Sequence, residues 1–193
     1  METMGENVAE TVEAARDGDT EAFRRLVESH SRRIFGLAYR LTGSVEDAED
    51  VVQETFFRAH RQLDRFEDRS SFGTWLYRIT VNCSHDLMRK RRRHDERDEP
   101  LETGSGDTLP VPAGGPTADR QVLNGELRRK VAGALSCLSH MERSALILRH
   151  YEGLSIAEIG KVLGLGTSAA KHSVFRAVRK MRRELKPLAA VIE

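Results

Sequence analysis

The chain has 193 residues, of which 39% are hydrophobic and 32% are charged, so one or two small cores lie beneath a heavily charged surface. A formal net charge of +1 neither favours nor excludes binding to nucleic acid, so this question depends on how the charges are distributed along the chain. No apolar run approaches the roughly 20 residues of a membrane span, and the leading segment does not resemble a signal peptide. We therefore expect a cytoplasmic protein without membrane insertion.

Two helices with clear boundaries are predicted at the start of the chain. A weakly amphipathic helix over residues 6–17 ends at Gly18. The next helix is capped by Asp19 or Thr20 and stops at Gly43, because glycine adopts the left-handed conformation that ends many helices. Its apolar residues recur every three or four positions, which predicts one buried face.

A third and a fourth helix follow. The segment Ser44–Leu63 has an apolar stripe at helical spacing, and Ser44 with Asp47 indicates the start of a capping box. A loop then leads to a long helix that begins at Ser70 or Ser71. The short connections predict that the four helices form a bundle.

The third helix carries more acidic and amide side chains than its position explains. A helix dipole favours acids near the N-terminus, which accounts for some of them. It does not account for Asp50, Gln53 and Glu54, which lie three and four residues apart and end beside the aromatic pair Phe56 and Phe57. This cluster indicates a functional surface.

The composition changes between the two predicted domains. Gly, Pro and acids dominate residues 94–118 and no helical period survives, which indicates a flexible acidic linker. A functional loop packed on a domain is the less favoured alternative at this length. The linker separates a domain over 1–93 from a second domain over 119–193.

The second domain is also helical. Leucines and valines at four-residue steps predict its first helix, and two capping boxes, Ser139 with Glu142 and Ser155 with Glu158, predict the starts of two more. No strand pattern is present, so the fold class is all-α with two small helical domains.

The end of the chain has the pattern of a helix-turn-helix. A short helix over 156–163 contains Gly160, where two helices have to cross closely, and Gly164 supplies the turn. The last helix is predicted from near Ser168 to Pro187 and is rich in cations from its first turns. A solvated amphipathic helix is the alternative, but cations there suit phosphate binding better.

The fourth helix ends in the cationic run Arg89–Arg93. Cations are favourable near helix C-termini, so a solvent-exposed surface without a binding role is the simplest explanation. A polar stripe of Arg78, Asn82, Asp86 and Arg89, placed opposite Trp75 and Ile79, favours a surface that faces a DNA duplex. A core role for Trp75 is equally consistent with its apolar stripe.

Catalysis and metal binding are not indicated. The seven histidines are scattered, and no Glu-x-x-His pair, phosphate-binding loop, dinucleotide motif or nucleophile elbow occurs. We therefore expect no catalytic residue, no cofactor and no metal. Cys83 and Cys137 are expected to be buried or half-buried thiols rather than a disulfide or zinc site.

The motifs resemble those of a known family. The DxxQE pattern within DAEDVVQETFFRA is similar to the helix with which bacterial sigma factors bind core RNA polymerase, and EGLSIAEIGKVLG resembles the first helix and turn of sigma region four. The short two-part layout resembles the extracytoplasmic-function (ECF) class over about 20–93 and 122–185. Lys171, Arg176 and Ala177 match the recognition helix, whereas Ser173 replaces a usual arginine.

The resemblance implies partners and site residues. The implied partners are promoter DNA, an anti-sigma factor and core RNA polymerase, which the chain would contact at the clamp and the flap. Phe66 with Asn82 would hold a flipped base. The implied polymerase-binding residues are Asp50, Gln53, Glu54, Phe57 and Arg58. The implied minus-ten residues are Phe66, Trp75, Arg78, Asn82, Arg89, Arg91 and Arg92. The implied minus-thirty-five residues are Ser168, Ala169, Lys171, His172, Ser173, Arg176 and Arg179.

A free-standing helix-turn-helix regulator that binds DNA as a dimer is the alternative function. Its first domain would then be an interaction module. A sigma factor binds core polymerase as a monomer and binds promoter DNA poorly by itself, whereas a repressor binds DNA tightly without polymerase.

Overall fold

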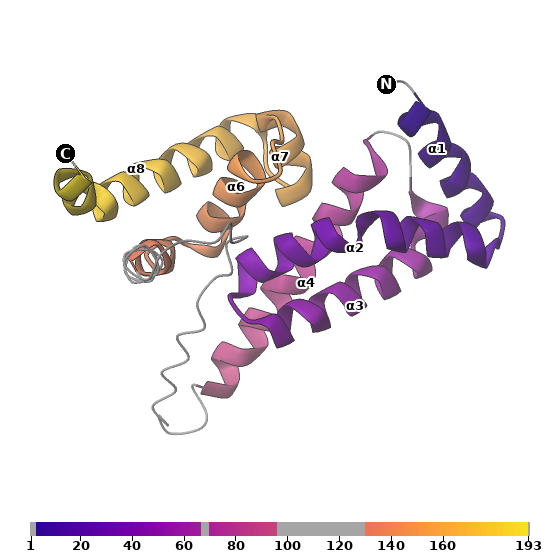
Figure 1. Ribbon diagram of the computed structural model, residues 1–193, viewed down its shortest axis with the longest axis horizontal. Coiled ribbons are helices and arrows are strands. Elements are labelled where there is room, and N and C mark those ends of the chain that lie inside the picture. The colour runs from indigo at the N-terminus through magenta and orange to yellow at the C-terminus, as the bar shows by residue number, and fades with distance from the viewer. Residues whose placement is uncertain (1–2, 67–69, 96–129, 193) are drawn as a thin grey trace. The chain divides into compact units, whose positions relative to one another are not determined.

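The computed structural model describes residues 3–66, 70–95 and 130–192, and within these ranges the chain forms helices and turns with no strand. It divides into two compact units, residues 1–99 and residues 100–193, called unit 1 and unit 2 below (Figure 1). The all-α fold class is confirmed. Most of the predicted linker, residues 96–118, lies outside the described residues, so the domain boundaries stay predictions.

Unit 1 is built from helices α1 to α4 and one short 3-10 turn. The helices are α1 (Thr3–Arg16), α2 (Thr20–Thr42), α3 (Val45–Arg61) and α4 (Phe72–Asp95), and the 3-10 turn is η1 (Leu63–Arg65). Helices α2, α3 and α4 pack against one another, and α1 packs on α2. Burial of one large apolar side chain contributes about 1.5–3 kcal/mol. The fully buried large apolar side chains here are Leu26, Ile34, Leu37, Leu41, Val51, Leu76 and Val81.

The helix boundaries in unit 1 follow from their caps. The Asp19 carboxylate accepts from the backbone N–H groups of Glu21 and Ala22 at 2.8 and 3.0 Å, which satisfies two of the unpaired donors at the start of α2. Gly43 ends α2 with a φ of 82°, in the left-handed region. The Ser44 side chain accepts from the N–H of Asp47 at 3.3 Å and starts α3.

An aromatic cluster closes one end of unit 1. The ring of Phe66 lies 5.6 Å from that of Phe72 and 5.2 Å from that of Trp75. A guanidinium nitrogen of Arg16 donates to the Phe66 carbonyl at 2.7 Å. These contacts hold Phe66 against α1 and α4.

Unit 2 contains helical residues 130–136 and the helices α6 (His140–His150), α7 (Ile156–Leu163) and α8 (Thr167–Ile192). Both predicted capping boxes are present, at Ser139 with Glu142 and at Ser155 with Glu158. Leu138, Leu146 and Ala177 form part of the core, where α6 packs on α8.

The predicted crossing at Gly160 is confirmed and has a clear cause. A Cβ added at Gly160 would lie 2.7 Å from the backbone oxygen of Leu165, closer than real Cβ atoms approach, and the N–H of Leu165 donates to the Gly160 carbonyl at 2.8 Å. Gly164 follows with a φ of 65°. The turn can therefore pack directly on α7 only where α7 has no side chain.

Two predictions for the end of the chain and for the thiols are wrong in part. The last helix continues past Pro187 to Ile192. A proline removes one N–H donor from a helix but does not always end it. Cys83 is buried as expected, whereas Cys137 is exposed, because it follows the helical residues 130–136 at the surface.

Neither a membrane span nor a metal site is found in the described ranges. None of the helices in these ranges has both the length and the apolar character needed to cross a bilayer. Among the described residues, no three His, Cys, Asp or Glu side chains are grouped as metal ligands.

Candidate functional site

A groove of about 540 Å³ lies between α3 and α4 and is called the α3–α4 groove below. All residues for which the sequence implied polymerase binding line it. They come from one face of α3, where positions three and four apart are neighbours. The lining residues are Asp50, Val51, Gln53, Glu54, Phe57, Arg58, Cys83, Asp86, Leu87 and Lys90.

One ion pair, between Arg58 and Asp86, joins the two walls of this groove, and each partner has a second ion pair on its own helix. Nε of Arg58 lies 2.6 Å from a Glu54 carboxylate oxygen, and Nη1 of Arg58 lies 3.4 Å from Asp86 of α4. Asp86 also pairs with Arg89 at 2.8 Å. The hydrogen bond to Glu54 raises the pKa of Arg58, so its cation is kept. Because such half-exposed pairs stabilise a fold by at most about 1 kcal/mol, this network is better suited to recognition than to stability.

An exposed aromatic ring lies at the edge of the groove. Phe57 is 56% exposed, and the guanidinium carbon of Arg61 lies 5.5 Å from its ring centroid. Exposed aromatic side chains beside charged ones are typical of protein-binding surfaces. The groove therefore combines acids, an amide and an aromatic ring on one open face.

Sequence reasoning assigned none of the four α4 residues to this groove. Asp86 was placed on the DNA-facing stripe, Lys90 in the cationic run and Cys83 among the buried or half-buried thiols, and Leu87 was given no site role. Burial raises the pKa of Cys83, so the thiol stays protonated near neutral pH. A signal was available for Asp86 and Lys90, because their four-residue spacing places both on one helix face.

The residues implied for minus-ten recognition are only partly brought together. Arg78, Asn82, Arg89 and Arg92 are exposed on α4. Trp75 is half-buried. It precedes Asn82 by two helical turns, so both side chains lie on the same face of α4. The prediction that the polar stripe lies opposite Trp75 is therefore wrong. Phe66 is 5% exposed and packs in the aromatic cluster, so it would have to leave that cluster to hold a base.

Arg91 differs from the other cations at the end of α4. Its Nη2 lies 2.5 Å from a carboxylate oxygen of Asp47 in the first turn of α3. Asp47 is buried, which raises the pKa of its carboxyl, and the Arg91 charge opposes that rise. Arg91, which the resemblance implied as a DNA contact, is thus paired with a buried acid of unit 1.

Helix α8 presents most of its implied DNA-binding residues to solvent. Ser168, Ala169, Lys171, His172 and Arg179 are exposed. Ser173 is buried and its hydroxyl donates to the Ala169 carbonyl at 3.0 Å, so its predicted exposure is wrong. The reason is its spacing, because Ser173 lies on the same face as the buried Ala170 and Ala177.

Two cations of α8 pair with one buried acid of α6. Nε of Arg176 lies 3.3 Å from Glu142 of α6, and Nζ of Lys180 lies 2.6 Å from the same carboxylate. Glu142 is also the capping-box acid of α6. The position of α8 on α6 is therefore fixed by charge as well as by apolar packing.

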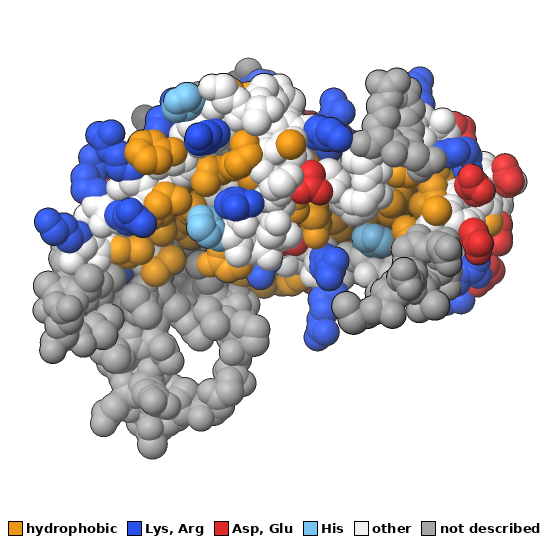
Figure 2. Space-filling model, turned by 90° about the horizontal axis from the view of Figure 1, so that it is seen from above, with side chains coloured by type: hydrophobic (Ala, Val, Ile, Leu, Met, Phe, Trp, Pro, Cys, Tyr) orange, Lys and Arg blue, Asp and Glu red, His pale blue; other side chains and the backbone are white. Residues whose placement is uncertain are grey.

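The solvent-exposed face of α8 carries both apolar and cationic side chains. A groove of about 550 Å³ between α6 and α8 includes Phe175, which is 63% exposed. Figure 2 shows Lys and Arg side chains interleaved with hydrophobic ones over the visible surface of unit 2. Such a surface can bind phosphates and apolar groups together. The groove is lined by Arg149, His150, Ile156, Lys171, Val174, Phe175, Val178, Arg179 and Arg182.

Comparison with protein families matches both units. The Sigma-70 region 2 family model matches residues 26–94, and the Sigma-70 region 4 model matches residues 128–181. The matched segments contain the α3–α4 groove and the helix-turn-helix.

Curated relatives match over nearly the whole length. The ECF RNA polymerase sigma factor SigW of Bacillus subtilis is 30% identical over 190 residues, covering 97% of this chain and 100% of that protein. The RNA polymerase sigma-H factor of Pseudomonas aeruginosa is 34% identical over 181 residues, covering 92% and 93%.

A solved structure has the same fold. The sigma factor RpoE in complex with the anti-sigma factor NepR from Bartonella quintana has a TM-score of 0.69 and 27% identity, covering 86% of this chain and 98% of that one.

Proposed function

This chain belongs to the extracytoplasmic-function sigma factors of bacterial RNA polymerase, and on that premise we propose which of its surfaces bind the polymerase and which bind the promoter. It is an alternative sigma factor, which binds core polymerase and directs it to a class of promoters. We assign polymerase docking to unit 1 and promoter contacts to both units, in the cytoplasm.

The docking proposal rests on the α3–α4 groove. Its acids, its amide and the exposed Phe57 lie on one open face, and the Arg58–Asp86 ion pair connects the two walls. Asp50 and Glu54 suit a cationic partner surface, and Phe57 suits an apolar pocket at its centre. We propose that the polymerase clamp occupies this groove.

The promoter proposal rests on the exposed cations and polar side chains of α4 and α8. Arg78 and Asn82 present donors and an amide to the duplex, and the cations at the end of α4 neutralise phosphates. The first turns of α8 carry Ser168, Ala169 and Lys171, whose short or flexible side chains allow approach to a major groove. We propose minus-ten recognition by α4 and minus-thirty-five recognition by α8.

We also propose regulation by an anti-sigma factor. The Bartonella quintana RpoE, which shares the fold, is bound to the anti-sigma factor NepR. An inhibitor of this kind that covers the α3–α4 groove would block polymerase binding. Its expected effect is a parallel loss of core binding and of transcription.

Run-off transcription tests the function directly. Purified full-length chain is mixed with core polymerase and a library of promoter fragments, and the transcribed fragments are sequenced. We expect a defined set with a shared minus-ten and minus-thirty-five pattern. Tight DNA binding without polymerase, with no transcript, would instead favour a free-standing regulator.

A further inference from the structure

We propose that Arg91 is a positioning residue rather than a DNA contact. Its ion pair with Asp47 holds the last turns of α4 against the first turn of α3 and so sets where the neighbouring cations meet the promoter. This inference rests on the proposed function, because it concerns how the proposed minus-ten surface of α4 is held in place.

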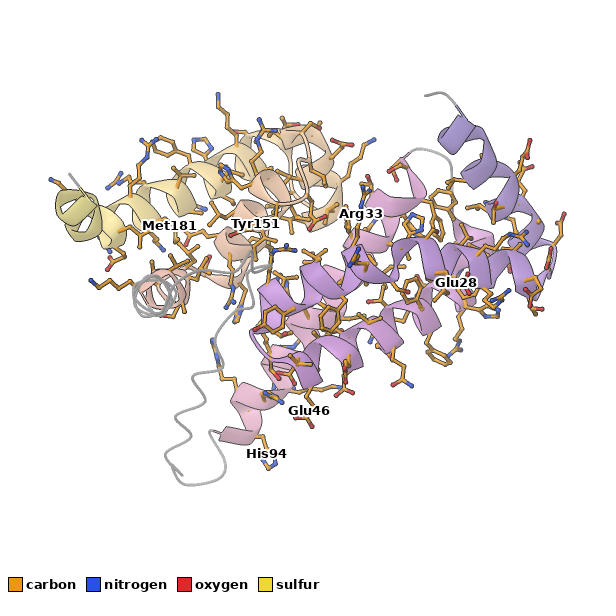
Figure 3. The ribbon with its side chains drawn as sticks, viewed as in Figure 1. Glu28, Arg33, Glu46, His94, Tyr151 and Met181 are labelled. Atoms are coloured by element: carbon orange, nitrogen blue, oxygen red, sulfur yellow. The ribbon has the colours of Figure 1, made fainter. Side chains whose placement is uncertain are left out.

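The geometry of the pair carries the argument. Asp47 is 4% exposed, and its carboxylate oxygen lies 2.5 Å from Nη2 of Arg91, whose side chain is 57% exposed. A buried carboxylate is costly unless a charge or hydrogen bond compensates it. In Figure 3, Glu46 at the start of α3 and His94 near the end of α4 lie at the same end of unit 1. The pair therefore connects segments that are far apart in sequence.

The end of α4 needs such a connection. Leu87 and Met88 are half-buried, but the residues from Arg89 to His94 are all exposed, so apolar packing does little to hold these turns. Terminal turns with few buried contacts open most readily. An ion pair to a buried acid on α3 fixes the direction of the helix at the point where packing ends.

The two roles for Arg91 predict opposite effects of Asp47→Asn. This substitution removes a negative charge and releases Arg91. If Arg91 contacts a phosphate, its release strengthens promoter binding, because more positive charge faces the DNA. If Arg91 positions α4, the same substitution weakens promoter binding although the protein has become more positive.

The experiment measures promoter affinity of the holoenzyme. Full-length variants are assembled with core polymerase and titrated with a fragment obtained by run-off selection, over a series of salt concentrations. We expect Asp47→Asn and Arg91→Ala each to weaken binding roughly fivefold, and the double variant to be no weaker than either. Arg91→Lys should restore part of the loss. Glu46→Gln, an equal charge change at the adjacent exposed position, should not weaken binding.

Folding is controlled by working at a temperature where circular dichroism shows every variant to be fully helical. A purely structural role would leave the affinity unchanged there, which would overturn the inference. Stronger binding by Asp47→Asn would also overturn it. Arg91→Ala is interpreted only together with the double variant, because loss of a phosphate contact would weaken binding as well.

Arg92→Ala separates this inference from the proposed function. We expect it to weaken binding and to lower the salt slope by about 0.9, as for one lost phosphate contact. If Arg92→Ala changes neither the affinity nor the slope, the proposed DNA surface at the end of α4 is wrong and the inference falls with it. If Arg92→Ala weakens binding while Asp47→Asn does not, only the positioning role of Arg91 is wrong.

Discussion

Glu142 accepts a 2.6 Å hydrogen bond from Lys180, which lies 38 residues later in the chain. The same carboxylate accepts from the backbone N–H of Ser139 at 3.1 Å and lies 3.3 Å from Nε of Arg176. One buried acid therefore caps α6 and anchors two cations of α8.

Removing this acid should destabilise unit 2. Glu142→Ala removes the capping bond and the partner of two cations, and we expect a loss of roughly 2 kcal/mol in the free energy of unfolding. Hydrogen exchange of the α6 and α8 amides reports it. Glu158→Ala is the matched control, because it removes a capping-box acid at the surface and should cost less than about 1 kcal/mol. Equal losses would contradict the anchoring role.

The same acid should make unit 2 sensitive to acid. Burial raises the pKa of Glu142, but the bonds from Lys180 and Ser139 outweigh it and lower the pKa below the ordinary 4.5. The unfolded chain then takes up a proton at a higher pH than the folded chain. Its contribution to stability is complete above about pH 4.5 and is lost as the pH falls through the lower folded-state pKa.

Glu142→Gln should therefore flatten the acid side of the stability profile. The measurement is hydrogen exchange or denaturant unfolding of unit 2 between about pH 3 and pH 6. Part of the slope should remain, because hydrogen bonds with Ser155 also lower the pKa of Glu158. An unchanged profile would show that Glu142 gains no net stabilisation from its partners.

The turn of the helix-turn-helix should tolerate no side chain at Gly160. In Gly160→Ala the new Cβ would lie 2.7 Å from the Leu165 oxygen, and because that oxygen belongs to the backbone, α7 and the turn have to separate. We expect a loss of about 1–3 kcal/mol and weaker promoter binding. Gly166→Ala is the control, since nothing lies within 4 Å of its Cβ. Similar behaviour of the two variants would contradict the close crossing.

Lys171 should contact a phosphate. It is exposed near the start of α8, and Lys171→Ala is expected to lower the salt slope of holoenzyme binding by about 0.9. Arg24→Ala in unit 1 serves as the control for charge, because Arg24 pairs with Glu21 and Glu28 on α2. An unchanged slope in Lys171→Ala would remove this residue from the interface.

Local patterns predicted the helices well. Asp19, Gly43, Ser139 and Gly164 act on their own neighbours in sequence, so the boundaries that they set are visible without a structure. Asp50, Gln53 and Glu54 were singled out for the same reason, because one helix face brings them together. Phe57 and Arg58 were instead implied by the family resemblance.

Contacts between segments far apart in sequence account for the errors at Arg91 and Phe66. Nothing near Arg91 in the sequence reveals that Asp47 lies beside it, whereas the burial of Ser173 could have been inferred from its spacing with Ala170 and Ala177. The burial of Phe66 depends on the packing of its ring against Phe72 and Trp75 of α4. These relations depend on packing angles and long-range pairing, which a single sequence does not specify.

The affinity of the full-length chain for core RNA polymerase tests the central claim most directly. Asp50→Ala with Gln53→Ala removes two side chains from the α3–α4 groove, and Glu49→Ala removes one charge from an exposed neighbour outside it. We expect the double variant to stay folded and to lose core binding at least tenfold, and Glu49→Ala to bind normally. Normal core binding by the folded double variant would contradict docking through this groove.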